Sequence, residues 1–131
     1  SFSSSSMINF LIDIMLSGRD VALYNVNKER DFIHISDAVK ACELVVNSET
    51  KGLGVLDIGT GVGVSIKDLT STIKKATDFK GQLKFIENSQ IKVIDSVADP
   101  VPAKTLLGFE CTADFDAELS QIVKKRKRAL K

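Results

Sequence analysis

The sequence contains few of the residues that build metal centres. Its 131 residues include one histidine, His34, and two cysteines, Cys42 and Cys111. The cysteines lie far apart without the spacing of metal ligands, and a single histidine cannot complete a zinc site with them. We therefore expect no metal site, and two buried, reduced thiols as in a cytoplasmic protein.

The sequence also lacks a long hydrophobic run and a large charge of one sign. The apolar run Met7–Leu16 is too short to cross a bilayer, and no basic residues precede it as they would in a signal peptide. The net charge of +1 gives no overall attraction to nucleic acid or to a membrane surface. We expect neither a nucleic-acid partner nor a membrane partner.

One basic run requires a separate interpretation. Residues 124–128 hold five of the 18 basic residues, at the expected end of the last helix. A nucleic-acid patch is one interpretation and a solvated helix terminus is the other. We favour the helix terminus, because cations stabilise the C-terminal end of a helix and the rest of the chain is net negative.

Hydrophobic periodicity predicts a single α/β domain over residues 7–131, after a flexible serine-rich lead over residues 1–6. Helices are expected at residues 7–16, 66–76, 100–107 and from Asp114 onward. Strands are expected at residues 21–24 and at residues 83–87, the second of them beside a strand at residues 56–58.

The segment from Arg30 to Val39 combines a charged pair with the start of a helix. Phe32 to Ile35 alternates in the manner of a short strand, and Ser36 or Asp37 is the expected N-cap of a helix over residues 38–46. A guanidinium just before this strand-to-helix junction is well placed to reach an anion. The simpler interpretation is a surface arginine that pairs with Glu29 or Asp31.

A glycine-rich segment, Val55 to Gly63, invites a different interpretation. It reads as a strand followed by a tight turn and then a helix capped by Ser65, with Asp68 three residues later. This pattern matches the first motif of class I methyltransferases and imitates a dinucleotide-binding turn, although Val64 stands where a further glycine is wanted. The alternative, which we favour, is a tight turn in which the glycines relieve crowding.

Four segments in sequence order resemble one protein family, the extended short-chain dehydrogenase/reductases that act as nucleotide-sugar epimerases and dehydratases. The resemblance covers nearly the whole chain and rests on residues 18–24, Arg30 to Val39, Leu56 to Gly61 followed by Ser65 and Ile66, and Ala98 to Phe109. Each match is weak by itself, whereas four in the right order make the assignment strong.

The resemblance implies an α/β fold, namely the small C-terminal substrate-binding lobe of such an enzyme, with short strands, four or five helices and an incomplete Rossmann unit. It implies that Ala22 and Tyr24 border the base of a nucleotide-diphosphate sugar and that Arg30 binds its phosphate. NAD or NADP would be bound mainly by a missing N-terminal Rossmann domain of a dimeric parent enzyme, and this chain alone would bind no cofactor.

The sequence departs from the family in three respects. The glycine fingerprint for the cofactor and the catalytic Tyr-x-x-x-Lys are absent, since Tyr24 and Lys28 fall in a strand and a turn and not on one helix face. The turn before Arg30 is about one residue short. The family's second phosphate-binding arginine is missing from residues 88–95, where only Lys92 could replace its charge.

These features lead to three hypotheses. The chain is the substrate-binding part of a larger NAD(P)-dependent nucleotide-sugar epimerase or dehydratase and is inactive alone. Alternatively, it is a stand-alone nucleotide-binding module without catalysis. The least favoured hypothesis is a truncated S-adenosylmethionine-dependent methyltransferase that uses Asp57 to Gly63.

Overall fold

The structure is a computed structural model that describes residues 6–49 and 54–130. The chain divides into two compact units. The first unit comprises Ser1–Lys28, Ser65–Ile94 and Asp116–Lys131, and the second comprises Glu29–Val64 and Asp95–Phe115. Of the flexible lead expected at residues 1–6, residues 1–5 lie outside the described residues, and Ser6 is the N-cap of the first helix. The single domain over residues 7–131 stays a prediction.

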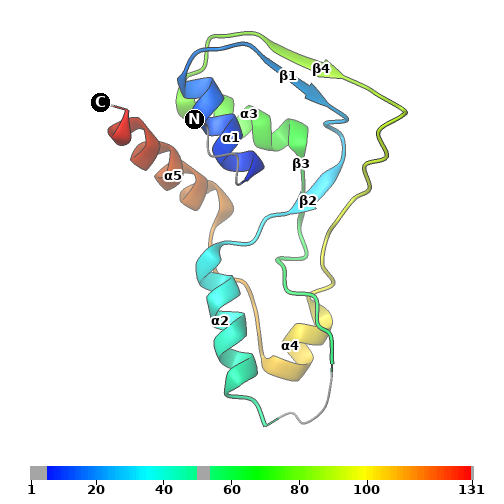
Figure 1. Cartoon of the computed structure of the whole chain (residues 1–131). Coiled ribbons are helices and arrows are strands. Elements are labelled where there is room, and N and C mark those ends of the chain that lie inside the picture. The colour runs from blue at the N-terminus through cyan, green and yellow to red at the C-terminus, as the bar shows by residue number, and fades with distance from the viewer. Residues whose placement is uncertain (1–5, 50–53, 131) are drawn as a thin grey trace. The chain divides into compact units, whose positions relative to one another are not determined.

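The first unit contains three helices and a two-stranded parallel sheet (Figure 1). The helices are α1 (Met7–Leu16), α3 (Ile66–Thr77) and α5 (Phe115–Ala129). Strand β1 (Val21–Tyr24) pairs in parallel with β4 (Leu83–Ile86), so that Val21 lies opposite Leu83 and Tyr24 opposite Ile86. The predictions for β1 and β4 are confirmed, but the predicted neighbour of β4 is wrong because residues 56–58 form no strand.

Local signals fix the two ends of α1 and the start of α3. The Ser6 hydroxyl accepts a hydrogen bond from the Asn9 amide, and α1 ends at Ser17 followed by Gly18 in the left-handed region, with φ of 72°. At the start of α3 the Ser65 hydroxyl accepts from the Asp68 amide at 3.0 Å and donates to the Asp68 carboxylate at 2.7 Å. Helix α3 therefore begins where its predicted capping residue, Ser65, places it.

The core of the first unit is formed by apolar faces of its three helices. Leu11 and Ile12 of α1 are fully buried, as are Leu69 and Ile73 of α3. Helix α1 packs on α3. Helix α5 contributes the buried Leu119 and Val123, as its periodicity predicts.

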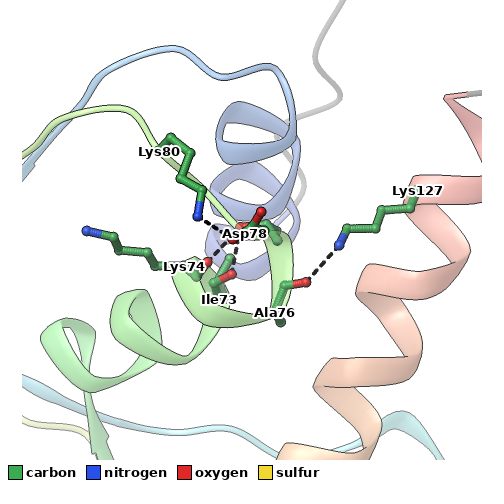
Figure 2. A network of polar contacts seen from close by, with 7 residues as sticks. Ile73, Lys74, Ala76, Asp78, Lys80 and Lys127 are labelled. Carbon is green, nitrogen blue, oxygen red and sulfur yellow. Dashed lines mark hydrogen bonds and ion pairs between the residues drawn. The ribbon is translucent and has the colours of Figure 1, made fainter.

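The basic end of α5 also contacts this core. Figure 2 shows Lys127 reaching the end of α3, where its ammonium donates to the Ala76 carbonyl at 2.9 Å. Arg126 pairs with the carboxylate of Asp13 on α1 at 3.5 Å. Two of the five cations in residues 124–128 therefore hold α5 in place, and the basic run is more than a solvated terminus.

The second unit contains α2 (Ile35–Val46), α4 (Val101–Leu107) and the short strands β2 (Glu29–Asp31) and β3 (Gly63–Ser65), which lie together in one sheet. Its apolar cluster is small and consists of Ala41, Ala103 and Phe109 with half-buried neighbours. The predicted class is confirmed, since the five helices and few short strands of the described residues make a small α/β structure.

Two local predictions in this unit are wrong. The strand covers Glu29–Asp31 and not residues 32–35, and α2 begins at Ile35 with His34 as its N-cap. His34 Nδ1 accepts from the Ser36 amide at 3.3 Å. Asp37 does not cap the helix because its carboxylate binds residues of a distant segment.

The prediction of two buried thiols is also wrong. Cys42 is exposed on α2 and Cys111 is half-buried, and neither forms a disulfide. Within residues 6–49 and 54–130, every helix is too short or too polar to cross a lipid bilayer.

Candidate functional site: a polar strand edge and an anchored arginine

The carboxyl ends of two parallel strands meet at one edge of the first unit. Ala22 and Tyr24 alternate along β1 and therefore project to the same face of the sheet, where both are exposed. Tyr24 is 52% exposed, and the chain turns directly after it. Ligands of open α/β sheets bind outside the carboxyl ends of parallel strands, so this edge is a candidate small-molecule site.

A cavity of about 260 Å³ opens beyond this edge. It is lined by the residues that follow the two strands: Asn25, Asn27, Lys28, Glu87, Asn88, Ser89, Ile91 and Val93. Lys92 lies between two lining residues and is exposed. Three of the four predicted substrate-binding residues, Ala22, Tyr24 and Lys92, thus belong to or adjoin one edge of the first unit.

Asn25 holds the loops around this cavity, a role that the sequence analysis missed. Its side-chain amide donates to the carbonyls of Asn88 and Ile91, both at 3.1 Å, and its side-chain oxygen accepts from the Asn88 amide at 2.8 Å. Its backbone is left-handed, with φ of 51°, and the residue is buried. An asparagine directly after a predicted strand was the available signal, since asparagine tolerates this conformation better than most residues.

Arg30, the fourth predicted residue, lies in the second unit. It is the middle residue of β2, and its Nη1 donates to the Glu29 carbonyl at 2.8 Å. Strand β2 is bound to Ser96 on both sides of Arg30, because the Asp31 amide donates to the Ser96 carbonyl and the Ser96 amide donates to the Glu29 carbonyl. The backbone of Arg30 is therefore fixed, and its side chain is half-buried.

Asp31 is the point at which three segments of the second unit meet. One carboxylate oxygen accepts from the Thr60 amide at 2.9 Å and the Thr60 hydroxyl at 2.5 Å. The other accepts from the amides of Gly61 at 2.9 Å and Ala98 at 3.2 Å. Burial opposes ionisation, but these donors outweigh it and hold the pKa of Asp31 below its usual value.

This network accounts for the glycine-rich segment. A Cβ at Gly59 would collide with the Asp31 carboxylate and lie 2.6 Å from the Ala98 side chain, and Gly61 combines φ of 74° with close contact to Pro100. The glycines allow the loop to approach Asp31. Because Asp31 already occupies the amides of Thr60 and Gly61, they are not available to a cofactor, which weakens the methyltransferase interpretation.

Asp37 forms a second such network and is buried in the first turn of α2. Its carboxylate accepts from the amides of Thr112 and Ala113 and from the Thr112 hydroxyl, at 3.0 to 3.1 Å. Burial again opposes ionisation, and the hydrogen bonds lower the pKa of Asp37 overall. Asp31 and Asp37 lie in the predicted anion-binding segment, where the sequence predicted an ion pair for Asp31 and a helix N-cap for Asp37 but not these networks.

Three other kinds of chemistry find less support in the described residues: a catalytic Tyr–Lys pair, a reactive thiol and a metal site. Tyr24 ends β1, and Lys28 follows a turn closed by the Asn25 carbonyl, so the two do not share a helix face. Burial, followed by the charges of Asp37 and Asp31, raises the pKa of Cys111, whose thiol donates to the Gly59 carbonyl at 3.3 Å. The described residues contain no group of three or more acidic, histidine or cysteine side chains that could hold a metal ion.

Comparison with known proteins places these features in a family, although no family model matches the chain. The chain is 30% identical over 104 residues to the UDP-glucose 4-epimerase of Bacillus subtilis, an alignment that covers 76% of this chain and 30% of that enzyme. It is 29% identical over 103 residues to the UDP-glucose 4-epimerase of Drosophila melanogaster, with 76% and 29% covered.

The similar solved structures indicate the same family as the sequence relatives. MoeE5 in complex with UDP-glucose and NAD is 29% identical and matches with a TM-score of 0.83 over 96% of this chain and 42% of its own. The chain is a relative of the nucleotide-sugar epimerases and dehydratases. The UDP-glucose 4-epimerase of Thermotoga maritima, solved with UDP-glucose, shares the fold with a TM-score of 0.86 at 24% identity, over 99% of this chain and 42% of its own.

The match covers only part of each relative. The chain spans about a third of the length of the curated epimerases. The family of the extended short-chain dehydrogenase/reductases, predicted from four short motifs, is confirmed by these relatives. For this chain, the activity, substrates and partners of the whole epimerases are proposals only.

Proposed function

We propose that the chain is the substrate-binding part of an NAD(P)-dependent nucleotide-sugar epimerase or dehydratase and that it binds the nucleotide diphosphate of the sugar. The relatives are UDP-glucose 4-epimerases, and MoeE5 carries both UDP-glucose and NAD. These ligands belong to those proteins, but they indicate which small molecules to test on this chain.

Each proposed contact has a physical basis. The exposed face of β1 at Ala22 and Tyr24 gives a base a flat apolar surface. Arg30 offers a planar fork that can bind two phosphate oxygens at once, whereas the Lys92 ammonium supplies only a point charge. We therefore assign the larger share of the diphosphate affinity to Arg30.

The observation that carries this proposal is the anchoring of Arg30 by its neighbour. The Asp31 carboxylate accepts four hydrogen bonds from Thr60, Gly61 and Ala98. A phosphate-binding side chain on a strand held in this way loses little backbone entropy when it binds. The order Arg30-Asp31 thus supports an arrangement in which the aspartate builds the loop and the arginine meets the ligand.

Catalysis is expected to need residues beyond these 131. The sequence has no Tyr-x-x-x-Lys on a helix and no glycine fingerprint for a dinucleotide. In a complete enzyme the chemistry supplied by NAD or NADP would be hydride transfer, while this chain would hold and orient the nucleotide end of the substrate. The chain alone should bind a nucleotide sugar and turn nothing over.

Calorimetry with UDP-glucose tests the role of Arg30. Loss of a charge-assisted phosphate contact costs about 1.5–3 kcal/mol, so Arg30→Ala should weaken binding about 10- to 100-fold, and Arg30→Lys should recover part of the loss. Arg128→Ala is the matched control, because it removes a guanidinium from an exposed site at the end of α5. Unchanged affinity in Arg30→Ala would contradict the assignment.

Two further measurements separate the alternatives. Heat from S-adenosylmethionine, with none from UDP-glucose, would favour the methyltransferase interpretation. The mass of the native product in its own cells, detected with an antibody to this chain, distinguishes the other two. A product roughly twice as long or more leaves room for a dinucleotide-binding half, whereas a product of 131 residues favours the stand-alone binding module.

A further inference from the structure

The cavity beyond β1 and β4 is formed by one unit alone. All eight of its lining residues belong to the first unit, in the segments that follow the two strands. Its volume of about 260 Å³ is below the range of about 300–1,000 Å³ that is usual for a drug-sized ligand. The cavity therefore suits one part of a nucleotide sugar, such as the base.

Glu87 lies directly beyond the end of β1. Tyr24 is opposite Ile86 in the parallel pair of β1 and β4, so Glu87 is the next residue along the chain after the last paired one. Adjacent strands are about 4.8 Å apart. Glu87 is therefore a near neighbour of a base placed against the exposed Ala22 and Tyr24.

The loop around the cavity uses many of its polar groups to hold its own shape. The Asn25 side chain binds the backbone of Asn88 and Ile91. The Asn88 side-chain oxygen accepts from the Gln90 amide at 2.9 Å, and the Ile91 amide donates to the Asn88 carbonyl at 3.2 Å. These groups fix the loop, so other side chains of the lining must recognise the ligand.

Glu87 carries the only carboxylate among the eight lining residues. Its Oε1 accepts from the side-chain amide of Asn27 at 3.2 Å, which orients the carboxylate. An ionised carboxylate accepts hydrogen bonds and donates none. The cavity therefore favours a base whose edge carries donors over a base whose edge carries acceptors.

The common bases differ in this respect. Guanine has two adjacent donors, N1–H and the exocyclic amino group, which match the two oxygens of a carboxylate. Adenine and cytosine place one amino group beside a ring acceptor, and uracil places its N3–H between two carbonyl oxygens, which a carboxylate repels. Lys28 lines the same cavity, and its ammonium suits the guanine O6 acceptor next to N1–H.

We propose that Glu87 selects the base and that the preferred ligand class is a guanine nucleotide-diphosphate sugar. This inference rests on the proposed function, because it concerns the base of the substrate proposed there. The curated relatives compared above are UDP-glucose 4-epimerases. The guanine preference is therefore a property that we assign to this chain and not to its relatives.

Calorimetry with GDP, ADP, CDP and UDP tests this selection, because the four ligands share a diphosphate and differ in the base. GDP should bind about 10- to 100-fold more tightly than UDP, the effect expected of hydrogen bonds to a charged group. Glu87→Gln keeps the length of the side chain but removes its charge and one acceptor. It should weaken GDP binding about 10- to 100-fold and leave UDP binding nearly unchanged.

Glu43→Gln is the matched control, because it makes the same change at an exposed site on α2, outside this cavity. It should alter neither affinity. Equal or tighter binding of UDP to the unmodified chain would overturn the inference, and so would a guanine preference that survives Glu87→Gln. An equal loss of GDP and UDP binding in Glu87→Gln would also overturn it, because the residue would then be structural.

Guanosine and uridine, which lack the diphosphate, separate this inference from the proposed function. Guanosine binding that depends on Glu87, with no gain in affinity for GDP, would support base selection and refute the proposed diphosphate contact. GDP binding that depends on Arg30 but not on Glu87 would refute base selection and support the diphosphate contact. Failure of every nucleoside and nucleotide to bind would refute both.

Discussion

The two units of this chain are stabilised by different interactions. Of the 14 buried apolar residues in the described part of the chain, 11 belong to the first unit and three to the second. The second unit has a small apolar cluster but two carboxylates, Asp31 and Asp37, that each bind distant backbone amides. Apolar packing thus dominates the first unit, whereas hydrogen bonds to two carboxylates organise the second.

The two units also differ in net charge. The first unit holds 14 basic and seven acidic residues, a net charge of +7, and the second is net −6. The overall charge of +1 conceals this division. A near-neutral total therefore says little about the surface that each unit presents to a ligand or a partner.

The largest expected effect comes from the apolar core of the first unit. Leu69 is fully buried on α3, and Leu69→Ala should lower the free energy of unfolding by about 3–5 kcal/mol, because it loses transfer free energy and leaves a cavity. Urea denaturation followed by circular dichroism measures this loss. Leu106→Ala, at a site 57% exposed in the second unit, is the control and should change stability little. Equal effects of the two variants would contradict the comparison.

A smaller effect is expected from the carboxylate network of the second unit. Asp37→Asn keeps the side-chain shape but replaces one acceptor oxygen with a donor group that faces the Thr112 and Ala113 amides. The loss of charge-assisted hydrogen bonds should cost about 1.5–3 kcal/mol. Amide hydrogen exchange should accelerate at Thr112 and Ala113 while protection on α3 is retained.

The exposed Asp57→Asn serves as the control for Asp37→Asn, because it makes the same chemical change in the same unit. Uniform acceleration of exchange in both units would mean that they unfold together. In that case the distinction drawn between them would describe their packing but not their stability.

The smallest expected effect is the change in stability at acid pH, which depends on the two carboxylates of the second unit. The pKa values of Asp31 and Asp37 are lowered in the folded chain, so their contribution to stability is complete above the unfolded aspartate value of about 3.9 and is lost as the pH falls through the folded values. The unfolding free energy should therefore decrease below about pH 4. The double variant Asp31→Asn, Asp37→Asn should show a weaker acid dependence, and an unchanged dependence would contradict this assignment.

Prediction from sequence succeeded where structure depends on neighbours along the chain. Helix α1 ends at Ser17 and Gly18, and α3 begins at Ser65, as the capping residues predict. Strands β1 and β4 also lie where their alternation places them. The family was likewise accessible, because its motifs are short segments in a fixed order.

Prediction failed where a residue binds a distant partner. The sequence could not show that Asp37 binds Thr112, which is 75 positions away and draws the carboxylate away from helix capping. The glycine-rich segment was correctly predicted as a tight turn in which glycines relieve crowding, but the sequence could not show that Asp31, 29 and 30 positions away, would occupy it. Local propensities depend on a few adjacent residues and can therefore be predicted from the sequence. The partners of a buried carboxylate are set only when folding brings remote amides to it. An unpaired charge at such a site would cost more free energy than the local preference for capping a helix contributes.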